Sequence, residues 1–299
     1  MILRTLAIGE ILWDLLPTGP QMGGAPANFA HHARALGARA GVVTRVGSDP
    51  LGRDIQRRLE ELRLPLELVQ VDDSAPTGTV SVELSGEGIP NYTIHERVAW
   101  DHLEPTGPAL EAARGADAIC FGTLAQRAEP SRCTIQHLLR QSPPAALRIF
   151  DINLRQHFYS PSVIEQSLRL ANVLKLNETE LPVLAAMFDL KGDLETQAAA
   201  LAGMFDLAVV ALTLGPQGSL LYQGGRWSRC GTRPVQVRDT VGAGDAFTAA
   251  LAVGLLQKLD LDEINLAANE VARHVCSCVG ATPPLPESVR AIFARPSIQ

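Results

Sequence analysis

The sequence has no feature that would place it in a membrane, secreted or fibrous class. Its 299 residues contain no uninterrupted apolar run of membrane-spanning length, and the first apolar stretch, 6–16, is broken by Gly9, Glu10 and Asp14. We therefore expect neither a membrane span nor a secretory leader. Linkers, internal repeats and low-complexity segments are also absent from the sequence. These absences indicate a single globular domain over residues 1–299.

Cysteine and positive charge are also scarce. The five cysteines are odd in number and scattered, and none has zinc-binding spacing, so we expect reduced thiols in a cytoplasmic protein. The formal net charge of −6 argues against a nucleic-acid partner, which would need a basic surface. An anionic small molecule remains compatible, because the start of a helix binds anions without net positive charge.

The most informative stretch runs from Asp239 to Phe247. It reads Asp-Thr-Val-Gly-Ala-Gly-Asp-Ala-Phe and enters a helix predicted over 246–258. The first amides of a helix lack partners within it and carry about half a positive charge, which suits phosphate. Asp245 in this turn is well placed to take a proton from a substrate hydroxyl. From residue types alone, close packing of the glycines and helix stabilisation by Asp245 explain the stretch equally well.

The alternation of strands and helices along the chain predicts the fold. Buried strands are expected at 5–16, 41–47, 118–122, 148–153, 173–177 and 206–214, with a hairpin over 220–228 and a last long helix over 261–279. This rhythm indicates an α/β fold of three layers, αβα, with a mainly parallel central sheet. Ligands of such sheets bind beyond the carboxyl ends of the strands.

The segment 66–94 has a different pattern. Apolar and polar residues alternate, and Ser85-Gly86-Glu87-Gly88 provides a turn, which predicts half-exposed antiparallel strands without a helix. We expect a small β-sheet lid inserted at about 66–100. A lid exposes an apolar face, and pairing with a second copy of the chain would cover it.

Polar residues and glycines interrupt the N-terminal apolar pattern. Asp14 lies in the first predicted strand, and Gly23, Gly24 and Asn28 lie at the start of a helix that ends near Gly37. Glycines allow close approach of a ligand, and an amide offers a donor and an acceptor to a hydroxyl-rich molecule. An exposed strand end and a local helix cap would explain Asp14 and Asn28 without a ligand.

Three polar residues follow the strand predicted at 148–153, namely Asp151, Asn153 and Arg155. If the strand continues, these alternate residues share one side. They would then present an acceptor, an amide and a planar cation suited to phosphate or carboxylate. An ion pair within a loop is the alternative interpretation.

Together these motifs resemble those of the ribokinase-like (PfkB) carbohydrate kinases, in a fructokinase-like form. The resemblance covers most of the chain. The matching stretches are 239–247, Gly23-Gly24-Ala25-Pro26-Ala27-Asn28-Phe29-Ala30, Asp151-x-Asn153-x-Arg155, Asn177-x-x-Glu180 and Thr213-x-Gly215-x-x-Gly218.

The resemblance implies a role for each matching residue. Asp245 is the implied catalytic base, beside an anion hole of Gly242, Ala243 and Gly244 and with Arg155 near the transferring phosphate. The implied sugar contacts are Asp14, Gly23, Gly24, Asn28, Arg97 and Asn153. The implied ATP contacts are Lys175, Asn177, Thr213, Gly215, Gly218, Asn269 and Ala272. Glu180 would reach magnesium through water, and Asp239 would bind a monovalent cation such as potassium.

Several of these roles have simpler alternatives. Asn177 can cap the next helix, and Asp239 can stabilise its own loop. The family pattern has an arginine near this point, and either Glu96 or Arg97 can occupy that position in this sequence. Arg97 can equally be a surface charge.

The implied activity is transfer of the γ-phosphoryl group of ATP to a hydroxyl of a monosaccharide, with fructose expected first. A 2-keto-3-deoxygluconate kinase or a nucleoside kinase of the same fold is an alternative, because the region of Glu96 and Arg97 departs from the fructokinase pattern. A catalytically idle sugar- or nucleotide-binding regulator is the alternative from another class. The complete motif around Asp245 argues against it. The lid implies a homodimer.

Overall fold

The computed structural model describes residues 2–17, 19–84 and 90–294. Its main sheet has nine strands in the order β13-β12-β11-β10-β9-β8-β1-β4-β5. Their bounds are β1 Arg4–Ile8, β4 Arg39–Gly47, β5 Val69–Asp72, β8 Ala118–Phe121, β9 Leu147–Asp151, β10 Val173–Asn177, β11 Val209–Thr213, β12 Ser219–Gln223 and β13 Arg226–Cys230. Neighbours from β5 to β11 pair in parallel, whereas β11, β12 and β13 pair antiparallel.

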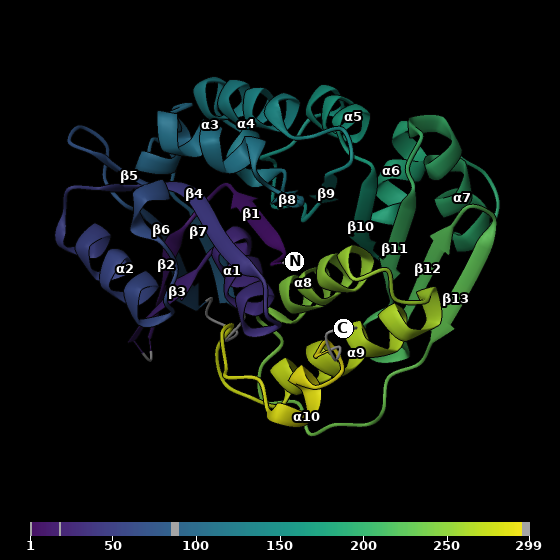
Figure 1. The fold of residues 1–299 in the computed structure, drawn as a ribbon. Helices are drawn as coiled ribbons and strands as arrows, with labels where there is room; N and C mark the ends of the chain where they lie inside the picture. Colours follow the sequence, from purple (N-terminus) through teal and green to yellow (C-terminus); the bar gives the residue numbers. More distant parts are fainter. Residues whose placement is uncertain (1, 18, 85–89, 295–299) are drawn as a thin grey trace.

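Helices cover both faces of this sheet (Figure 1). One face carries α3 Gly107–Arg114, α4 Glu129–Gln141, α5 Pro161–Leu170, α6 Leu181–Met187 and α7 Leu194–Phe205. The other carries α1 Ala25–Ala35, α2 Pro50–Glu61, α8 Ala243–Leu256 and α9 Leu261–Cys276. Short helices, η1 Leu66–Leu68, η2 Ala99–His102, η3 Leu124–Gln126, η4 Gly215–Gln217 and α10 Glu287–Arg290, occupy connections. The predicted three-layer α/β fold is confirmed.

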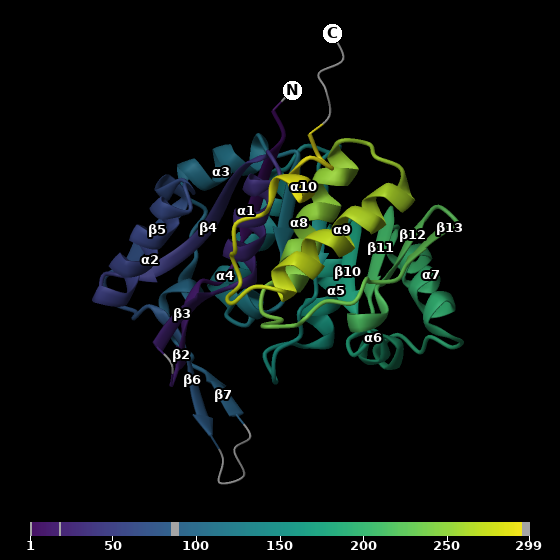
Figure 2. The same ribbon diagram turned by 90° about the horizontal axis from the view of Figure 1, so that it is seen from below.

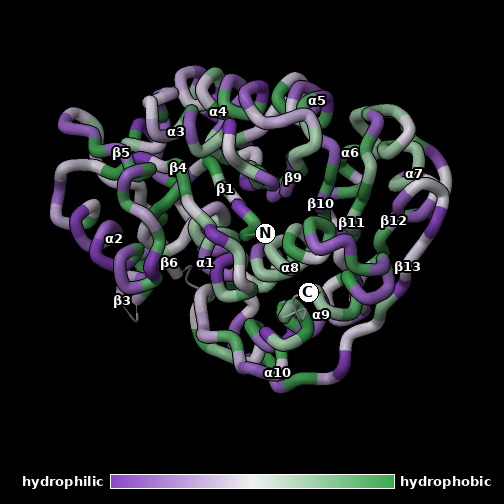
Figure 3. Tube along the Cα trace, in the orientation of Figure 1, coloured by the Kyte–Doolittle hydropathy of each residue, from purple (hydrophilic) through white to green (hydrophobic). Residues whose placement is uncertain are grey.

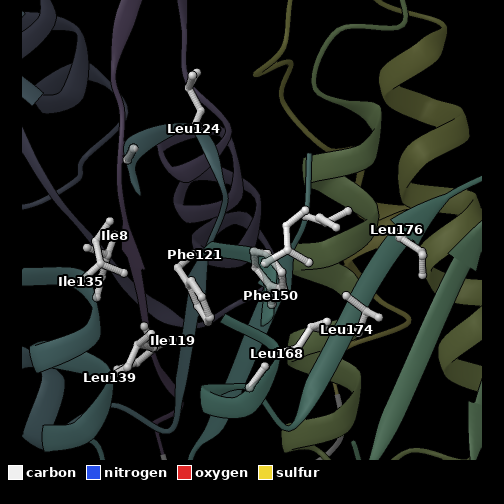
Figure 4. Packing of buried hydrophobic residues seen from close by; sticks show 14 of the residues in the cluster. Ile8, Ile119, Phe121, Leu124, Ile135, Leu139, Phe150, Leu168, Leu174 and Leu176 are labelled. Atoms are coloured by element: carbon white, nitrogen blue, oxygen red, sulfur yellow. The ribbon is translucent and has the colours of Figure 1, made fainter. Parts of the chain in front are cut away.

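Alternation along the strands divides the buried hydrophobic residues into two clusters, one on each face of the sheet. Phe121 of β8 and Phe150 of β9 stack with 5.2 Å between ring centroids and belong to the cluster with α4 and α5 (Figure 4). Ile149 belongs to the cluster with α8. By the same alternation, Asp151 of β9 and Lys175 of β10 face α8.

Hydrophobic composition decides which helices lie at the surface and which at the centre. Helix α2 is largely hydrophilic in Figure 3 and buries only Gly52, Ile55 and Leu59. Helix α8 is buried continuously from Ala246 to Gly254, between the sheet, α1 and α9. A helix that is apolar on all sides needs such surroundings. The N-terminus of α8 is therefore held inside the molecule, near the strand ends.

A second sheet of four strands projects from the main body (Figure 2). It contains β2 Leu12–Leu16, β3 Gly19–Gly23, β6 Gly78–Leu84 and β7 Pro90–Ile94, in the order β3-β2-β6-β7. The prediction of one strand over 5–16 is therefore wrong. The chain leaves the main sheet at Gly9, whose φ of 151° is unusual for other residues, and enters the lid at Leu12.

The predicted lid boundaries at 66–100 also need correction. Val69–Asp72 pairs in parallel with β4 and so extends the main sheet, and the block contains two short 3₁₀ helices at its ends, η1 and η2. Strands β6 and β7 form the expected antiparallel hairpin. Its predicted turn, Ser85-Gly86-Glu87-Gly88, lies outside the described residues. Among the residues that the structure describes, no helix is both long and apolar enough to cross a membrane.

Candidate active site

The site is built around the first turn of α8. Gly242 is the N-cap and has φ 78°, a conformation that favours glycine. A Cβ at this position would lie 2.6 Å from the carbonyl oxygen of Ala281, so no larger residue fits. Among the described residues no side chain caps this helix. The amide of Ala243 donates to the carbonyl oxygen of Thr240 at 3.3 Å, whereas the amides of Gly244 and Asp245 have no partner among the described residues and are free to bind an anion.

Asp245 lies in this first turn and is joined to α1. Asn28 donates a hydrogen bond from Nδ2 to Asp245 Oδ2 at 2.8 Å, across 217 positions of sequence. Asn28 reaches this place because α1 packs against α8 and because the chain enters α1 through Gly24. Gly24 has φ 118°, and a Cβ there would lie 2.6 Å from the carbonyl oxygen of Glu10. The two glycine-rich motifs thus meet at one carboxylate.

The surroundings of Asp245 raise its pKa to about 6. Burial is the largest cause, and the negative charge of Asp151 adds to it. The hydrogen bond from Asn28 and the charges of Lys175 and Arg155 act in the opposite direction. A carboxylate with a pKa near neutrality is still ionised at pH 7 and accepts a proton more readily than an ordinary aspartate.

Lys175 supplies a buried positive charge beside the helix N-terminus. Its Nζ donates to Asp151 Oδ1 at 3.0 Å, and both side chains are less than one tenth exposed. The second oxygen of Asp151 accepts from Thr248 Oγ1 at 2.7 Å. A Cβ at Gly244 would lie 3.1 Å from Nζ, a tight contact, so glycine at this position leaves room for the lysine beside the first turn of α8.

Burial lowers the pKa of the Lys175 ammonium, but the charges of Asp151, Glu180 and Asp245 outweigh it and raise the pKa overall. The lysine therefore remains positively charged at neutral pH. Because Asp151 neutralises much of that charge, the pair is close to neutral before an anion arrives.

Asp14 comes from the lid sheet and faces the same region. A Cβ at Gly23, which pairs with Leu12 in the β2–β3 ladder, would lie 2.6 Å from Asp14 Oδ2, so Gly23 leaves room for the carboxylate. Burial raises the pKa of Asp14, and the charge of Arg155 lowers it. The charge of the same arginine also lowers the pKa of Asp245.

The segment after β9 differs from its prediction. The strand ends at Asp151, and Asn153 has φ 43°, so Asp151, Asn153 and Arg155 do not share one side as an extended strand would arrange them. Instead Asp151 pairs with Lys175, whereas Arg155 is exposed in the loop. The left-handed conformation at Asn153 turns the chain, and Arg155 follows this turn as an exposed residue.

Glu180 fixes this loop to the end of β10. Its Oε1 accepts from the amide of Leu154 at 3.0 Å and its Oε2 from the amide of Asn177 at 2.8 Å. Asn177 Oδ1 in turn accepts from the amides of Thr179 and Glu180, at 2.9 and 3.0 Å, and so closes the turn before α6, whose N-cap is Glu180 and not Asn177. Both oxygens of Glu180 accept from backbone amides, so the carboxylate has a structural role here, and its contact with magnesium through water stays a prediction.

The predicted nucleotide loop lies beside this strand end. Thr213 closes β11, and Gly215 and Gly218 have φ of 52° and 98° around η4. A Cβ at Gly218 would lie 1.9 Å from the carbonyl oxygen of Cys230, so this glycine is required by the β12–β13 hairpin itself. Gly215 is less confined, because a Cβ there would meet only Glu178, at 3.3 Å.

Asn269 and Ala272 lie on α9, where they contact the protein interior. Asn269 is buried and donates from Nδ2 to Ser219 Oγ at 2.7 Å and to the carbonyl oxygen of Asn265 at 2.8 Å. Ala272 packs against the cluster shared with α8. The Asn269 amide therefore fastens α9 to β12, a role that the sequence did not suggest.

Asp239 joins two segments next to the α8 N-terminus. Its Oδ1 accepts from the amide of Val241 at 3.0 Å and its Oδ2 from the amide of Gly280 at 3.0 Å. Asp239 thus has the loop-stabilising role that was the alternative to cation binding. Binding of a monovalent cation between these two segments stays a prediction.

Comparison with known proteins identifies the family. The family model for pfkB family carbohydrate kinases matches residues 19–288 of the chain. The chain belongs to the pfkB family. Its similarity to fructokinases extends over nearly the whole length, because it is 31% identical to the fructokinase of Klebsiella pneumoniae over 288 residues, 92% of each protein.

Solved structures of pfkB kinases have the same fold. The fructokinase of Vibrio cholerae O395, with fructose, ADP and calcium bound, superposes with a TM-score of 0.79 at 26% identity, over 98% of this chain and 99% of that one. A sugar kinase of Pyrococcus horikoshii in complex with ATP superposes with a TM-score of 0.81 at 28% identity, over 96% and 99% of the two chains. The resemblance predicted from the motifs is therefore confirmed.

In this pfkB kinase the predicted Arg97 lies apart from the other predicted sugar contacts. It is exposed, has φ 59°, and lines a separate cavity with Glu96, Asp101 and Arg127. That cavity does not include Asp14, and in the described part of the chain Arg97 forms no hydrogen bond or ion pair with the residues around Asp245.

Glu10 is the residue of this region that the sequence analysis did not assign to the site. It is 3% exposed, and its Oε2 has no hydrogen-bond partner among the described residues. The pKa of Glu10 is raised to about 7, mainly by burial, and the charge of Asp245 acts in the same direction. The charges of Arg155 and Arg127 act to lower it. A carboxylate inside an apolar stretch was the available signal, but only the packing against Gly24 shows that it lies beside the site.

Proposed function

We propose that this pfkB carbohydrate kinase transfers the γ-phosphoryl group of ATP to a hydroxyl of a monosaccharide, with Asp245 as the base. One observation carries the proposal: the carboxylate of Asp245, bound by Asn28, stands in the uncapped first turn of a buried helix. This arrangement combines a proton acceptor and an anion site within one turn. Phosphoryl transfer requires little more than such positioning and charge stabilisation.

In the proposed reaction Asp245 takes the proton of the attacking hydroxyl. The new bond joins the sugar oxygen to the γ-phosphorus, and the bond between that phosphorus and the β,γ-bridging oxygen breaks, so ADP leaves with the electron pair. Asn28 keeps the carboxylate oriented by donating to one oxygen, which leaves the other for the substrate. Asp14 and the backbone near Gly24 would hold the remaining sugar hydroxyls.

Negative charge on the transferring group would be met by three kinds of donor. The first amides of α8 supply the helix end, Lys175 supplies a buried cation, and Arg155 supplies an exposed cation at the lid. As negative charge develops on the phosphate, the Lys175 ammonium would interact less with Asp151 and more with the phosphate. Closure of the lid over Arg155 would exclude water, which otherwise competes with the sugar as acceptor.

Magnesium fits this site as an ion that arrives with the nucleotide. Among the described residues no three His, Cys, Asp or Glu side chains gather into a metal cage. Magnesium usually retains several waters and binds substrate phosphates, so the few carboxylates here suffice. When bound, the ion would neutralise phosphate charge, with Glu180 in its outer shell.

Fructose is the proposed substrate, because the fructokinases of Klebsiella pneumoniae and Vibrio cholerae are similar over nearly the full chain. The test compares kcat/KM for fructose, 2-keto-3-deoxygluconate and a nucleoside with ATP, by ADP release and by mass spectrometry of the product. We expect fructose to exceed the others by about tenfold or more, the effect of a few matched polar contacts. A higher kcat/KM for the keto acid or the nucleoside would make that compound the substrate in place of fructose. Ligand binding without turnover of any sugar would favour a regulator.

We further propose a homodimer paired through the lid, acting in the cytoplasm. The lid sheet projects from the body, and Tyr92 on its β7 strand is 50% exposed (Figure 2). Covering such a sheet by a second copy is the usual way to remove an exposed apolar face. The five free cysteines agree with a reducing compartment.

A further inference from the structure

One buried histidine of α1 has no role in the phosphoryl-transfer site described above. His32 is 0% exposed, and its buried neighbours on the helix include the apolar Phe29, Ala30 and Ala33. A buried polar side chain is costly unless it forms hydrogen bonds, so an imidazole at this position needs an explanation.

The His32 ring reaches a backbone oxygen 249 positions away in the sequence. Its Nε2 lies 2.9 Å from the carbonyl oxygen of Ala281, within hydrogen-bond distance. Because a carbonyl oxygen can only accept, the proton of the neutral ring must be on Nε2. Nδ1 is then an acceptor, and it has no hydrogen-bond partner among the described residues. Within the part of the chain that the structure describes, the bond to Ala281 is therefore the one hydrogen bond of this ring.

Burial keeps the His32 ring uncharged. It lowers the pKa of His32 to about 3, and the charges of His31 and His274 act in the same direction. The bond to Ala281 acts to raise the pKa but does not outweigh burial. His32 is therefore a permanent hydrogen-bond donor near neutral pH and not a pH switch.

The accepting oxygen lies against the N-terminus of α8. A Cβ at Gly242, the N-cap, would lie 2.6 Å from the carbonyl oxygen of Ala281 and 2.7 Å from its Cα. Ala281 belongs to the connection 277–286, which contains no helix or strand. Among the described residues, His32 is the one hydrogen-bond donor to this oxygen. The contact between the connection and the N-cap therefore depends on His32.

Helix α1 thus holds the start of α8 at two points. Asn28 and His32 are four positions apart, which places them on the same face of α1. Asn28 donates to Asp245 Oδ2 at 2.8 Å inside the first turn of α8. His32 holds the backbone that packs against the N-cap of the same turn.

We infer that His32 is a positioning residue for phosphoryl transfer. By holding the Ala281 carbonyl oxygen beside Gly242, it fixes the first turn of α8 relative to α1. That turn carries the Asp245 carboxylate and the free amides, so its position decides whether base and anion site meet the substrate together. His32 itself contacts no reacting group and acts through Ala281. The inference rests on the proposed function of Asp245.

The state of the ring is tested without turnover. Nuclear magnetic resonance of protein carrying isotope-labelled histidine separates the two neutral tautomers from the charged form, and His32→Gln identifies the His32 signals. We expect a neutral ring protonated on Nε2 between about pH 5 and pH 8. A ring that titrates near the ordinary pKa of about 6.5, or a proton on Nδ1, would overturn the inference.

Two substitutions of similar size test the positioning role. Gln carries a donor at about the reach of imidazole Nε2, whereas Met has a similar length and no donor. We expect His32→Met to lower kcat by about tenfold to a hundredfold, because a misplacement of about 1 Å at the reacting groups can have that effect. The sugar dissociation constant from calorimetry should change little, and His32→Gln should recover most of kcat. If His32→Met does not fold, His32→Asn replaces it, since that amide is too short to reach Ala281.

His137→Met is the matched control, at an exposed histidine of α4 on the opposite face of the sheet, and should keep normal turnover. Denaturant unfolding of each variant shows whether a loss of kcat merely follows a loss of stability. Normal kcat in His32→Met, or an equal loss of kcat in His32→Gln and His32→Met, would refute the positioning role alone. Absence of turnover in the unmodified protein would refute the proposed function, and the positioning role with it.

Discussion

Asp245→Asn is expected to lower kcat by about two to four powers of ten, the usual contribution of a positioned general base. The asparagine keeps the size of the side chain and can still accept a hydrogen bond from Asn28, so folding and ligand binding should persist. The measurement is steady-state turnover with saturating ATP and sugar, together with the sugar dissociation constant from calorimetry. A fall in kcat without a comparable loss of sugar affinity would place the effect on the chemical step.

Asp54→Asn is the matched control for this substitution. Asp54 is a half-exposed aspartate on α2, and its one ion pair among the described residues is a surface contact of 3.0 Å with Arg57. Such pairs contribute little to stability, so this variant should keep normal turnover. Near-normal turnover in Asp245→Asn would remove the base from the mechanism.

Lys175→Met should have the second largest effect, on both stability and rate. It leaves Asp151 as a buried charge without its cation, which typically costs about 3–5 kcal/mol of unfolding free energy. It also removes a donor for the transferring group, which should lower kcat by about two to three powers of ten. Denaturant unfolding and steady-state turnover measure the two effects separately.

A double variant distinguishes the two roles of this lysine. Lys175→Met combined with Asp151→Asn removes both charges, so much of the lost stability should return, while kcat stays low. Lys191→Met, at an exposed lysine paired with Asp189, is the control and should change neither quantity. If the double variant also recovered its rate, Lys175 would act only through the fold.

The sequence predicts the main sheet well because its signals are local. Buried parallel strands are continuous apolar runs, and the strand expected at 173–177 is observed as Val173–Asn177. The lid is predicted less well, because its first two strands come from the N-terminal segment. Nothing in the run from Thr5 to Leu16 shows that Gly9 turns the chain from one sheet to another, since that turn depends on packing against Pro26 of α1.

The catalytic centre is predicted where a motif is contiguous and missed where contacts cross the fold. The glycine-rich helix start around Asp245 is local in sequence, so this turn could be expected. Its hydrogen bond to Asn28 and the pairing of Asp151 with Lys175 depend on helix packing and strand register. Glu10 has no motif at all, and only burial makes its carboxyl group important.

The pH dependence of kcat/KM tests most directly whether the Asp245 carboxylate is the base. Its pKa is raised to about 6, so the ionised form is complete well above pH 6 and is lost as the pH falls through that value. Glu10, with a pKa raised to about 7, is the neighbouring group that titrates in the same range. We therefore measure the unmodified enzyme beside Glu10→Gln, over the range in which both remain folded.

We predict an acid limb near pH 6 in the unmodified enzyme. In Glu10→Gln the limb should persist near pH 6, because Glu10, with its pKa raised to about 7, is already largely protonated and uncharged where Asp245 titrates. A profile that stays flat well below pH 6, or a limb that disappears with Glu10, would contradict the assignment of Asp245 as the base.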